Sequence, residues 1–303
     1  MESAQAYANA HGISILGDMP IYVSDESADF WANRTLFETT PEGEPKRIAG
    51  VPPDYFSEDG QLWGNPLYDW VRMKQDGYRW WLQRIGNSLK IYDAVRIDHF
   101  RGFYRYWAVP ADAKTARVGT WEPGPGMELF HAVNAAFSNP QIVAEDLGCE
   151  EEGLVQFLLE AGYPGMKVMQ FAYYGWDSIH LPYKYTENYV AYTGTHDNDT
   201  MLGWLWSLSR RSAANCLLIV ALRAIGLRWA AEPVLRAIFE TLWQTPARMT
   251  ILPVQDLCGY GTDTRMNLPG EAEGNWCFRM TEEALRQIDT AYFRQLNERY
   301  GRA

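Results

Sequence analysis

The chain has 303 residues, of which 47% are hydrophobic and 21% charged, as expected for one large soluble domain or two small ones. Its formal net charge of −11 would repel a phosphate backbone, so nucleic acid is not an expected partner, whereas a neutral substrate is compatible. The apolar run at 216–222 is too short to span a bilayer, and no signal-peptide pattern follows Met1. We therefore expect no membrane partner.

The cysteines and the aromatic residues narrow the possibilities further. The four cysteines lie far apart without a CxxC pair, which argues against a zinc knuckle or a disulfide framework and predicts a reducing, cytoplasmic environment. Aromatic residues make up 14% of the chain, with 13 Trp, 18 Tyr and 12 Phe. Such rings suit the apolar faces of sugars as well as protein cores, so both a ring-lined cleft and ordinary packing remain open.

Short apolar runs alternate with longer amphipathic stretches along the chain. The apolar runs predict buried strands at 13–17, 94–97, 142–144, 167–171, 189–193 and 249–252. The amphipathic stretches predict helices at 67–89, 126–137, 151–161, 211–224, 232–243 and 281–300. Residues 35–70 are rich in Pro, Gly and aromatics and predict a long, functional loop with little regular structure.

Strands that alternate with helices predict a parallel α/β fold. Four acidic residues, Asp18, Asp98, Glu145 and Asp197, each stand just after the last apolar residue of a predicted strand. In a (β/α) barrel these strand ends meet on one rim, where the chemistry takes place. Each of these residues taken singly could equally be a helix N-cap.

The segment VRIDHFRG at 95–102 places Arg96 and Asp98 on the same side of a strand. An arginine beside a carboxylate keeps it ionised, which is the state that a nucleophile needs. The alternative is a buried ion pair that only stabilises the strand.

Two further segments place acidic residues after predicted strands, in different surroundings. Glu145 ends an apolar strand, and desolvation there would raise its pKa, as suits a general acid. Asp146 is better explained as a turn or cap residue. His196 and Asp197 follow another strand and could hold sugar hydroxyls, although a His-Asp pair is also compatible with a metal site or a helix cap.

One ionised and one protonated carboxyl about 5 Å apart are the apparatus of retaining glycoside chemistry. The first attacks the anomeric carbon while the second protonates the leaving oxygen, and a third carboxylate can strengthen its hydrogen bonds in the transition state. The residues after the predicted strands are suited to these three tasks.

Long motifs resemble those of the 4-α-glucanotransferases (amylomaltases, or disproportionating enzymes) of glycoside hydrolase family 77, relatives of the α-amylases. They are GDMPIYV at 17–23, ESADFWAN at 26–33, AGVPPDYFSEDGQLWGNPLYDW at 49–70, VRIDHFRGFYRYW at 95–107, VAEDLG at 143–148, YTGTHDNDT at 192–200 and LPVQDLCGYGTDTRMNLPGEAEGNW at 252–276. The resemblance extends over nearly the whole chain.

The resemblance implies roles for individual residues. Asp98 would be the nucleophile, Glu145 the acid/base and Asp197 the transition-state stabiliser. The implied substrate-binding residues are Asp18, Tyr22, Tyr55, Phe56, Trp63, Arg96, His99 and His196. The loop at 52–65 resembles a flap that covers the glucan, with ordinary packing of its rings as the alternative. No metal or cofactor is implied.

The resemblance also implies a (β/α)8 TIM-type barrel, with 1–303 as a single catalytic domain and 35–70 as an active-site flap or insertion. Because Asp18 lies close to Met1, we expect the first two strands of the barrel to be missing, so that the six predicted strands match the third to eighth. The implied activity is transfer of α-1,4-glucan segments between maltooligosaccharides, amylose or related glucans. An α-glucan hydrolase, or a non-catalytic glucan-binding or unstable fragment, is the alternative.

Overall fold

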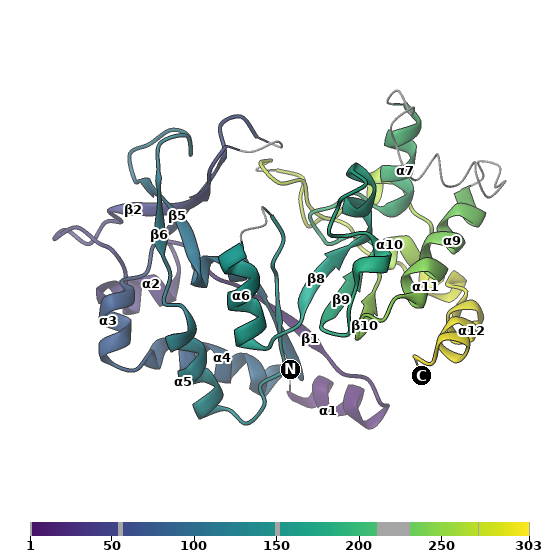
Figure 1. The fold of residues 1–303 in the computed structure, drawn as a ribbon, viewed down its shortest axis with the longest axis horizontal. Coiled ribbons are helices and arrows are strands. Elements are labelled where there is room, and N and C mark those ends of the chain that lie inside the picture. Colours follow the sequence, from purple (N-terminus) through teal and green to yellow (C-terminus); the bar gives the residue numbers. More distant parts are fainter. Residues whose placement is uncertain (1, 54–56, 149–151, 211–230, 272, 303) are drawn as a thin grey trace. The chain divides into compact units, whose positions relative to one another are not determined.

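The computed structural model describes residues 2–53, 57–148, 152–210, 231–271 and 273–302 (Figure 1). The chain forms two compact units, Met1–Gly165 and Met166–Ala303. The single catalytic domain over 1–303 stays a prediction.

The first unit contains a parallel three-stranded sheet in the order β1-β4-β7. Its strands are β1 (Leu16–Pro20), β4 (Ala94–Asp98) and β7 (Ile142–Ala144). Pro20 is paired with Asp98, and Ile97 with Ala144, so the three carboxyl ends lie at one edge of the sheet. The prediction at 13–17 began too early, because Ile13 is exposed and the pairing with β4 extends the strand through Asp18 to Pro20.

The described helices of this unit confirm most of the predicted ones. They are α1 (Glu2–Ala10), α2 (Ala28–Ala32), η1 (Arg34–Leu36), α3 (Trp70–Gln75), α4 (Arg79–Ile91), η2 (Phe100–Phe103), α5 (Met127–Ala136) and α6 (Glu152–Ala161). The single helix predicted at 67–89 is wrong. Gly77 (φ 70°) and Tyr78 (φ 59°) adopt left-handed backbone conformations, which interrupt a helix and separate α3 from α4.

The prediction of little regular structure at 35–70 is also wrong. Strands β2 (Arg47–Val51) and β3 (Gln61–Pro66) pair antiparallel, and β2 also pairs with β5 (Arg105–Pro110), which pairs with β6 (Thr120–Pro123) (Figure 1). Gly50 permits the close approach of β2 and β3, because a Cβ there would lie 2.5 Å from the carbonyl oxygen of Gln61. The register depends on partners far away in sequence, which local patterns do not reveal.

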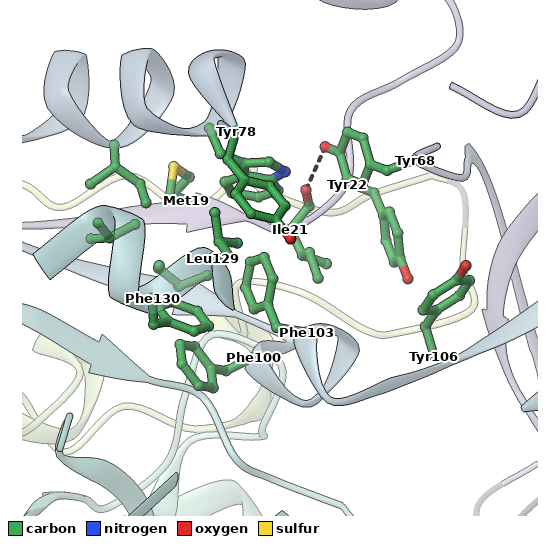
Figure 2. Packing of buried hydrophobic residues seen from close by; sticks show 14 of the residues in the cluster. Met19, Ile21, Tyr22, Tyr68, Tyr78, Phe100, Phe103, Tyr106, Leu129 and Phe130 are labelled. Atoms are coloured by element: carbon green, nitrogen blue, oxygen red, sulfur yellow. Dashed lines mark hydrogen bonds between the residues drawn. The ribbon is translucent and has the colours of Figure 1, made fainter. Parts of the chain in front are cut away.

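Aromatic side chains form much of the core of the first unit (Figure 2). Phe100 and Phe103 of η2 pack against each other with ring centroids 5.4 Å apart, and Phe130 of α5 contacts both. The hydroxyl of Tyr68 donates to the carbonyl oxygen of Ile21 at 2.7 Å. The segments that follow β1 and β4 are thus anchored in the core, which positions the strand ends.

The second unit contains a three-stranded sheet in the order β10-β9-β8, in which β9 and β10 are parallel. Its strands are β8 (Gly165–Val168), which begins at the last residue of the first unit, β9 (Tyr189–Tyr192) and β10 (Met249–Ile251). The described helices are η3 (Met169–Tyr174), η4 (Pro182–Lys184), α7 (Met201–Arg210), α9 (Ala231–Gln244), α10 (Val254–Leu257), η6 (Thr262–Thr264), α11 (Glu282–Gln287) and α12 (Thr290–Tyr300).

Two predictions in this unit need correction, and one lies outside the described residues. The strand predicted to reach Phe171 ends at Val168, where the 3-10 helix η3 takes over. The helix predicted at 281–300 is divided, because Asp289 accepts from the backbone N–H of Tyr292 and caps a new helix, α12. The helix predicted at 211–224 falls outside the described residues.

All six predicted strands are present, and the α/β class is confirmed. Among the helices in the described ranges, none is both long enough and apolar enough to cross a membrane. A single barrel formed by these strands stays a prediction.

Candidate active site

The end of β4 carries an arginine held between two carboxylates. Nη1 of Arg96 donates to the two oxygens of Asp18 at 2.7 and 2.8 Å, while Nη2 donates to Oδ1 of Asp98 at 2.6 Å. The arginine side chain is only 9% exposed, against 40% for Asp98. Burial alone would lower the pKa of Arg96, but Asp98, Asp18 and Glu145 raise it, so the guanidinium stays charged. Arg96 and Asp98 therefore lie on the same side of β4, as the sequence predicts.

Glu145 lies immediately after β7 and is buried. Its Oε2 accepts from the backbone N–H of His99 at 2.7 Å, and its Oε1 accepts from that of Leu147 at 2.8 Å. Burial, reinforced by the nearby charge of Asp98, raises the pKa of Glu145 to about 8, against the opposing effects of Arg96 and the two N–H groups. At neutral pH this carboxyl holds a proton, as the sequence analysis anticipated.

The two carboxyl groups therefore differ in environment although their strands are neighbours. The pairing of Ile97 with Ala144 brings the residues that follow, Asp98 and Glu145, to adjacent strand ends. Asp98 is in contact with a buried cation and partly exposed to solvent, whereas Glu145 is enclosed. A carboxyl paired with a cation, beside an enclosed carboxyl with a raised pKa, is the arrangement that nucleophilic attack and proton transfer require.

His99 adopts a left-handed backbone conformation (φ 50°) that directs its N–H to Glu145. Its ring contacts Trp63 edge to face at 4.8 Å, and the ring of Tyr22 lies 6.4 Å away. Burial, with a smaller effect of Arg101, lowers the pKa of His99 to about 4, so the imidazole is neutral at pH 7. A neutral imidazole can donate one hydrogen bond and accept another, which suits a sugar hydroxyl.

The third predicted carboxylate lies in the second unit, after β9. Oδ1 of Asp197 accepts from Nδ2 of Asn267 at 2.6 Å and lies 3.5 Å from Nε2 of His196. Nη2 of Arg265 donates to the backbone carbonyl of Asp197 at 2.5 Å. A loop that follows η6 thus holds both the backbone and the side chain of this residue.

A buried polar network supports the segment 193–201, which contains Asp197. Asp256 is 2% exposed and accepts from Oγ1 of Thr193 at 2.6 Å and from the backbone N–H of Met201 at 2.7 Å. Nε2 of Gln170 donates to the carbonyl oxygen of Asp199 at 2.7 Å. Burial raises the pKa of Asp256 to about 6 despite these bonds. The network fixes both ends of the segment.

Sequence reasoning missed Asp256, Arg265 and Asn267 as supporting residues. All three belong to the segment 252–276, which was noticed only as part of the resemblance. The available signal was the close spacing of polar residues in a segment that has no helical or strand periodicity. It did not show which strand end they would support.

The predicted site residues fall into two groups. The first unit brings together Asp18, Tyr22, Trp63, Arg96, Asp98, His99 and Glu145. The second unit brings together His196 and Asp197. Tyr55 and Phe56 fall outside the described residues. The roles assigned to all of these residues stay predictions.

Comparison with known proteins identifies the class to which this fold and site belong. The chain is a member of the glycoside hydrolases. More particularly, it belongs to glycoside hydrolase family 77, because the family model described as 4-alpha-glucanotransferase matches residues 1–285.

Similar proteins share that description. A 4-alpha-glucanotransferase of Streptococcus pneumoniae is 45% identical over 302 residues, which cover 97% of this chain and 59% of the relative. A chloroplastic/amyloplastic 4-alpha-glucanotransferase of Solanum tuberosum is 46% identical over 276 residues, which cover 90% of this chain and 47% of the relative. The chain thus spans about three fifths or less of the length of these two relatives.

Solved structures agree with the fold. An amylomaltase from Streptococcus agalactiae in complex with acarbose has a TM-score of 0.91 and 41% identity, covering 99% of this chain and 60% of that one. The amylomaltase of Corynebacterium glutamicum has a TM-score of 0.79 at 21% identity, covering 96% of this chain and 47% of that one, and supports the fold alone.

Proposed function

We propose that this chain carries the catalytic machinery of a 4-α-glucanotransferase, which transfers α-1,4-glucan segments between maltooligosaccharides or related glucans with retention of configuration. The observation that supports it most is the pair at the ends of β4 and β7. Asp98 is ion-paired to the buried Arg96, while burial keeps Glu145 protonated. Family membership and the names of the relatives support the same activity.

In the proposed first step, a carboxylate oxygen of Asp98 attacks the anomeric carbon of the donor glucan. The bond between that carbon and the leaving oxygen breaks, and Glu145 transfers its proton to this oxygen. Arg96 orients Asp98 for the attack through the hydrogen bond from Nη2 to Oδ1. The product is a covalent glycosyl ester on Asp98 and a shortened glucan.

In the second step, Glu145 takes the proton of an acceptor hydroxyl, whose oxygen attacks the anomeric carbon and displaces Asp98. Two inversions at one carbon give net retention. Asp197, held by Asn267, would hydrogen-bond to the sugar most strongly as its ring becomes oxocarbenium-like. His99 and His196 would bind hydroxyls of the same sugar.

We infer a (β/α)8-type barrel as the setting, with the six strands β1, β4, β7, β8, β9 and β10 delivering these residues to one rim. The loop at 52–65, with Tyr55 and Phe56, would cover the bound glucan. A sugar acceptor competes with water for the ester only if it is held in place and water is excluded. A cytoplasmic location is proposed from the dispersed cysteines.

Incubation of the chain with maltotriose tests this proposal. Glucose together with a ladder of longer maltooligosaccharides supports transfer, whereas glucose and maltose alone would identify a hydrolase. Asp98→Asn and Glu145→Gln should each abolish turnover. Asp93 provides a matched control, since it lies next to the opposite end of β4 and bonds to the backbone N–H of Ile15, so Asp93→Asn should retain turnover. A soluble, folded chain without turnover would favour the non-catalytic alternative.

A further inference from the structure

Trp276 is an exposed aromatic residue beside the third carboxylate. Its exposed fraction is 54%, so packing in the core does not explain its presence. Its ring centroid lies 5.2 Å from that of His196, with the two planes inclined by 40°. Since His196 immediately precedes Asp197, the tryptophan lies next to the proposed sugar site of the second unit.

The backbone of Trp276 has a φ of 61°, a left-handed conformation that bulky residues rarely adopt. The N–H of Trp276 donates to the carbonyl oxygen of Met266 at 2.7 Å, and the carbonyl oxygen of Trp276 accepts from Nη1 of Arg279 at 3.1 Å. A residue held in such a conformation requires surroundings that determine it, and such residues are concentrated at functional sites. The backbone that carries the exposed ring is therefore held in a defined conformation.

The loop that presents Trp276 is the same loop that holds Asp197. Asn267 contributes its side-chain amide to Asp197 and its backbone N–H to the carbonyl oxygen of His196 at 3.1 Å. The side chain of Asn275 closes the loop by accepting from the N–H of Leu268 at 2.9 Å and donating to the carbonyl oxygen of Glu271 at 2.9 Å. Carboxylate, imidazole and indole are consequently fixed relative to one another.

Trp63 in the first unit differs from Trp276 in its exposure and in its contacts with the protein. It also contacts a histidine, His99, but edge to face and with its own ring partly buried. Its Nε1 donates to the side chain of Gln61 at 3.2 Å. Trp63 is therefore engaged by protein contacts, whereas Trp276 leaves about half of its surface available to a ligand.

We propose that Trp276 is a stacking platform for a glucose unit of the bound α-1,4-glucan, next to the unit contacted by His196 and Asp197. The inference rests on the proposed function. A sugar ring presents an apolar face of C–H groups, which an exposed indole covers without forming specific hydrogen bonds. Stacking on the indole stabilises the bound substrate and the transition state equally. Loss of the ring therefore raises KM while kcat is retained.

Two substitutions separate stacking from simple packing. Trp276→Leu keeps an apolar side chain beside His196 but removes the flat ring, whereas Trp276→Phe keeps a smaller ring. We expect Trp276→Leu to raise KM for maltotriose roughly ten-fold, with kcat within about two-fold, and Trp276→Phe to recover most of the loss. Trp31, which is 75% exposed on α2 of the first unit, provides the control, and Trp31→Leu should leave both constants unchanged.

Direct binding completes the test. Calorimetric titration with maltoheptaose in the Asp98→Asn background avoids turnover, and Trp276→Leu should raise Kd roughly ten-fold there. Unchanged KM and Kd in Trp276→Leu would overturn the inference. So would equal losses of kcat in Trp276→Leu and Trp276→Phe at constant KM, since the ring would then only position His196.

The calorimetric titration also distinguishes a failure of this inference from a failure of the proposed function. A wild-type chain that transfers glucan, with binding insensitive to Trp276→Leu, would overturn the platform alone. A chain that does not transfer glucan, but whose binding of maltoheptaose weakens in Trp276→Leu, would overturn the transferase and support the platform. A chain that binds no maltoheptaose at all would overturn both.

Discussion

Among the site residues, the essential contrast is between two acids at the ends of neighbouring strands. Asp98 contacts a buried guanidinium that is fixed by a second carboxylate, Asp18, so its negative charge is compensated. Glu145 is enclosed, and the charge of Asp98 adds to the cost of ionising it. Removing Asp98 would therefore lower the pKa of Glu145, although burial would still hold it above its usual value.

The raised pKa of Glu145 has a consequence for stability. The folded chain keeps this proton up to about pH 8, while an unfolded glutamate releases it near 4.5. Between these values the folded state binds more protons than the unfolded state, so stability falls as pH rises, by up to about 1.4 kcal/mol per pH unit. The Glu145→Gln variant lacks this titrating group, so its free energy of unfolding should not fall in this way. The difference in free energy of unfolding between the variant and wild type should therefore increase from pH 5 to pH 8.

Urea unfolding at pH 5, 6, 7 and 8 measures that difference. The amide that Glu145→Gln introduces cannot accept from both backbone N–H groups, which subtracts a roughly constant amount of about 1 kcal/mol. The slope with pH is therefore the diagnostic quantity. Glu128→Gln is the control, because Lys74 lowers the pKa of that exposed carboxyl and no slope is expected. A flat difference for Glu145→Gln would contradict its enclosed, protonated state.

Among the secondary-structure elements, the 3-10 helix η2 connects β4, which ends at Asp98, to the core. Phe100 and Phe103 are fully buried, and the loop that follows β6 lies directly against η2. The N–H of Gly124 donates to the carbonyl oxygen of Tyr104 at 2.8 Å, and a Cβ at Gly124 would collide with the backbone carbonyl of Phe103. No side-chain rotation can relieve a collision with backbone.

Gly124→Ala should therefore destabilise the chain by about 2 kcal/mol and lower turnover, because η2 must shift and carries the end of β4 with it. Gly86→Ala is the matched control. Gly86 lies inside α4, where alanine favours the helix by about 1 kcal/mol relative to glycine. A Cβ added at Gly86 would lie 3.0 Å from the ring of Phe137, which can move. Chemical unfolding and maltotriose turnover of both variants check this expectation. Equal stability of the two would contradict it.

The strands that carry the site were the most predictable elements. Runs such as 94–97 and 142–144 are short, mostly apolar and followed by an acid, so strand and strand end are both visible in the sequence. The antiparallel sheet was not predictable. Its strands contain Gly50, Gly64 and Pro66, and their pairing with β5 depends on residues about sixty positions away.

The predicted helix boundaries are wrong where the backbone adopts a left-handed conformation or where a side chain caps a new helix. Gly77 and Tyr78 divide one predicted helix through left-handed backbone conformations, which tyrosine does not favour, and Asp289 divides another by capping. The supporting residues Asp256 and Asn267 belong to a segment without strand or helix periodicity. Their importance comes from tertiary hydrogen bonds, which residue types alone do not specify.

For the molecule as a whole, the proposed mechanism assigns roles to residues in each of the two units. The first unit carries the proposed nucleophile and acid, and the second carries Asp197 on its own supported segment. The covalent ester on Asp98 is the species on which the two proposed steps depend, since both transfer and hydrolysis pass through it.

Trapping that ester is the most direct measurement. α-Maltotriosyl fluoride loses fluoride without needing a proton, so the Glu145→Gln variant should form the ester and then fail to release it for want of a base. Peptide mass spectrometry should find one maltotriosyl group on the peptide that contains Asp98, and none in Asp98→Asn. A stable adduct on another residue, or turnover of the fluoride by wild type with no adduct on Asp98 in the variant, would contradict the assignment.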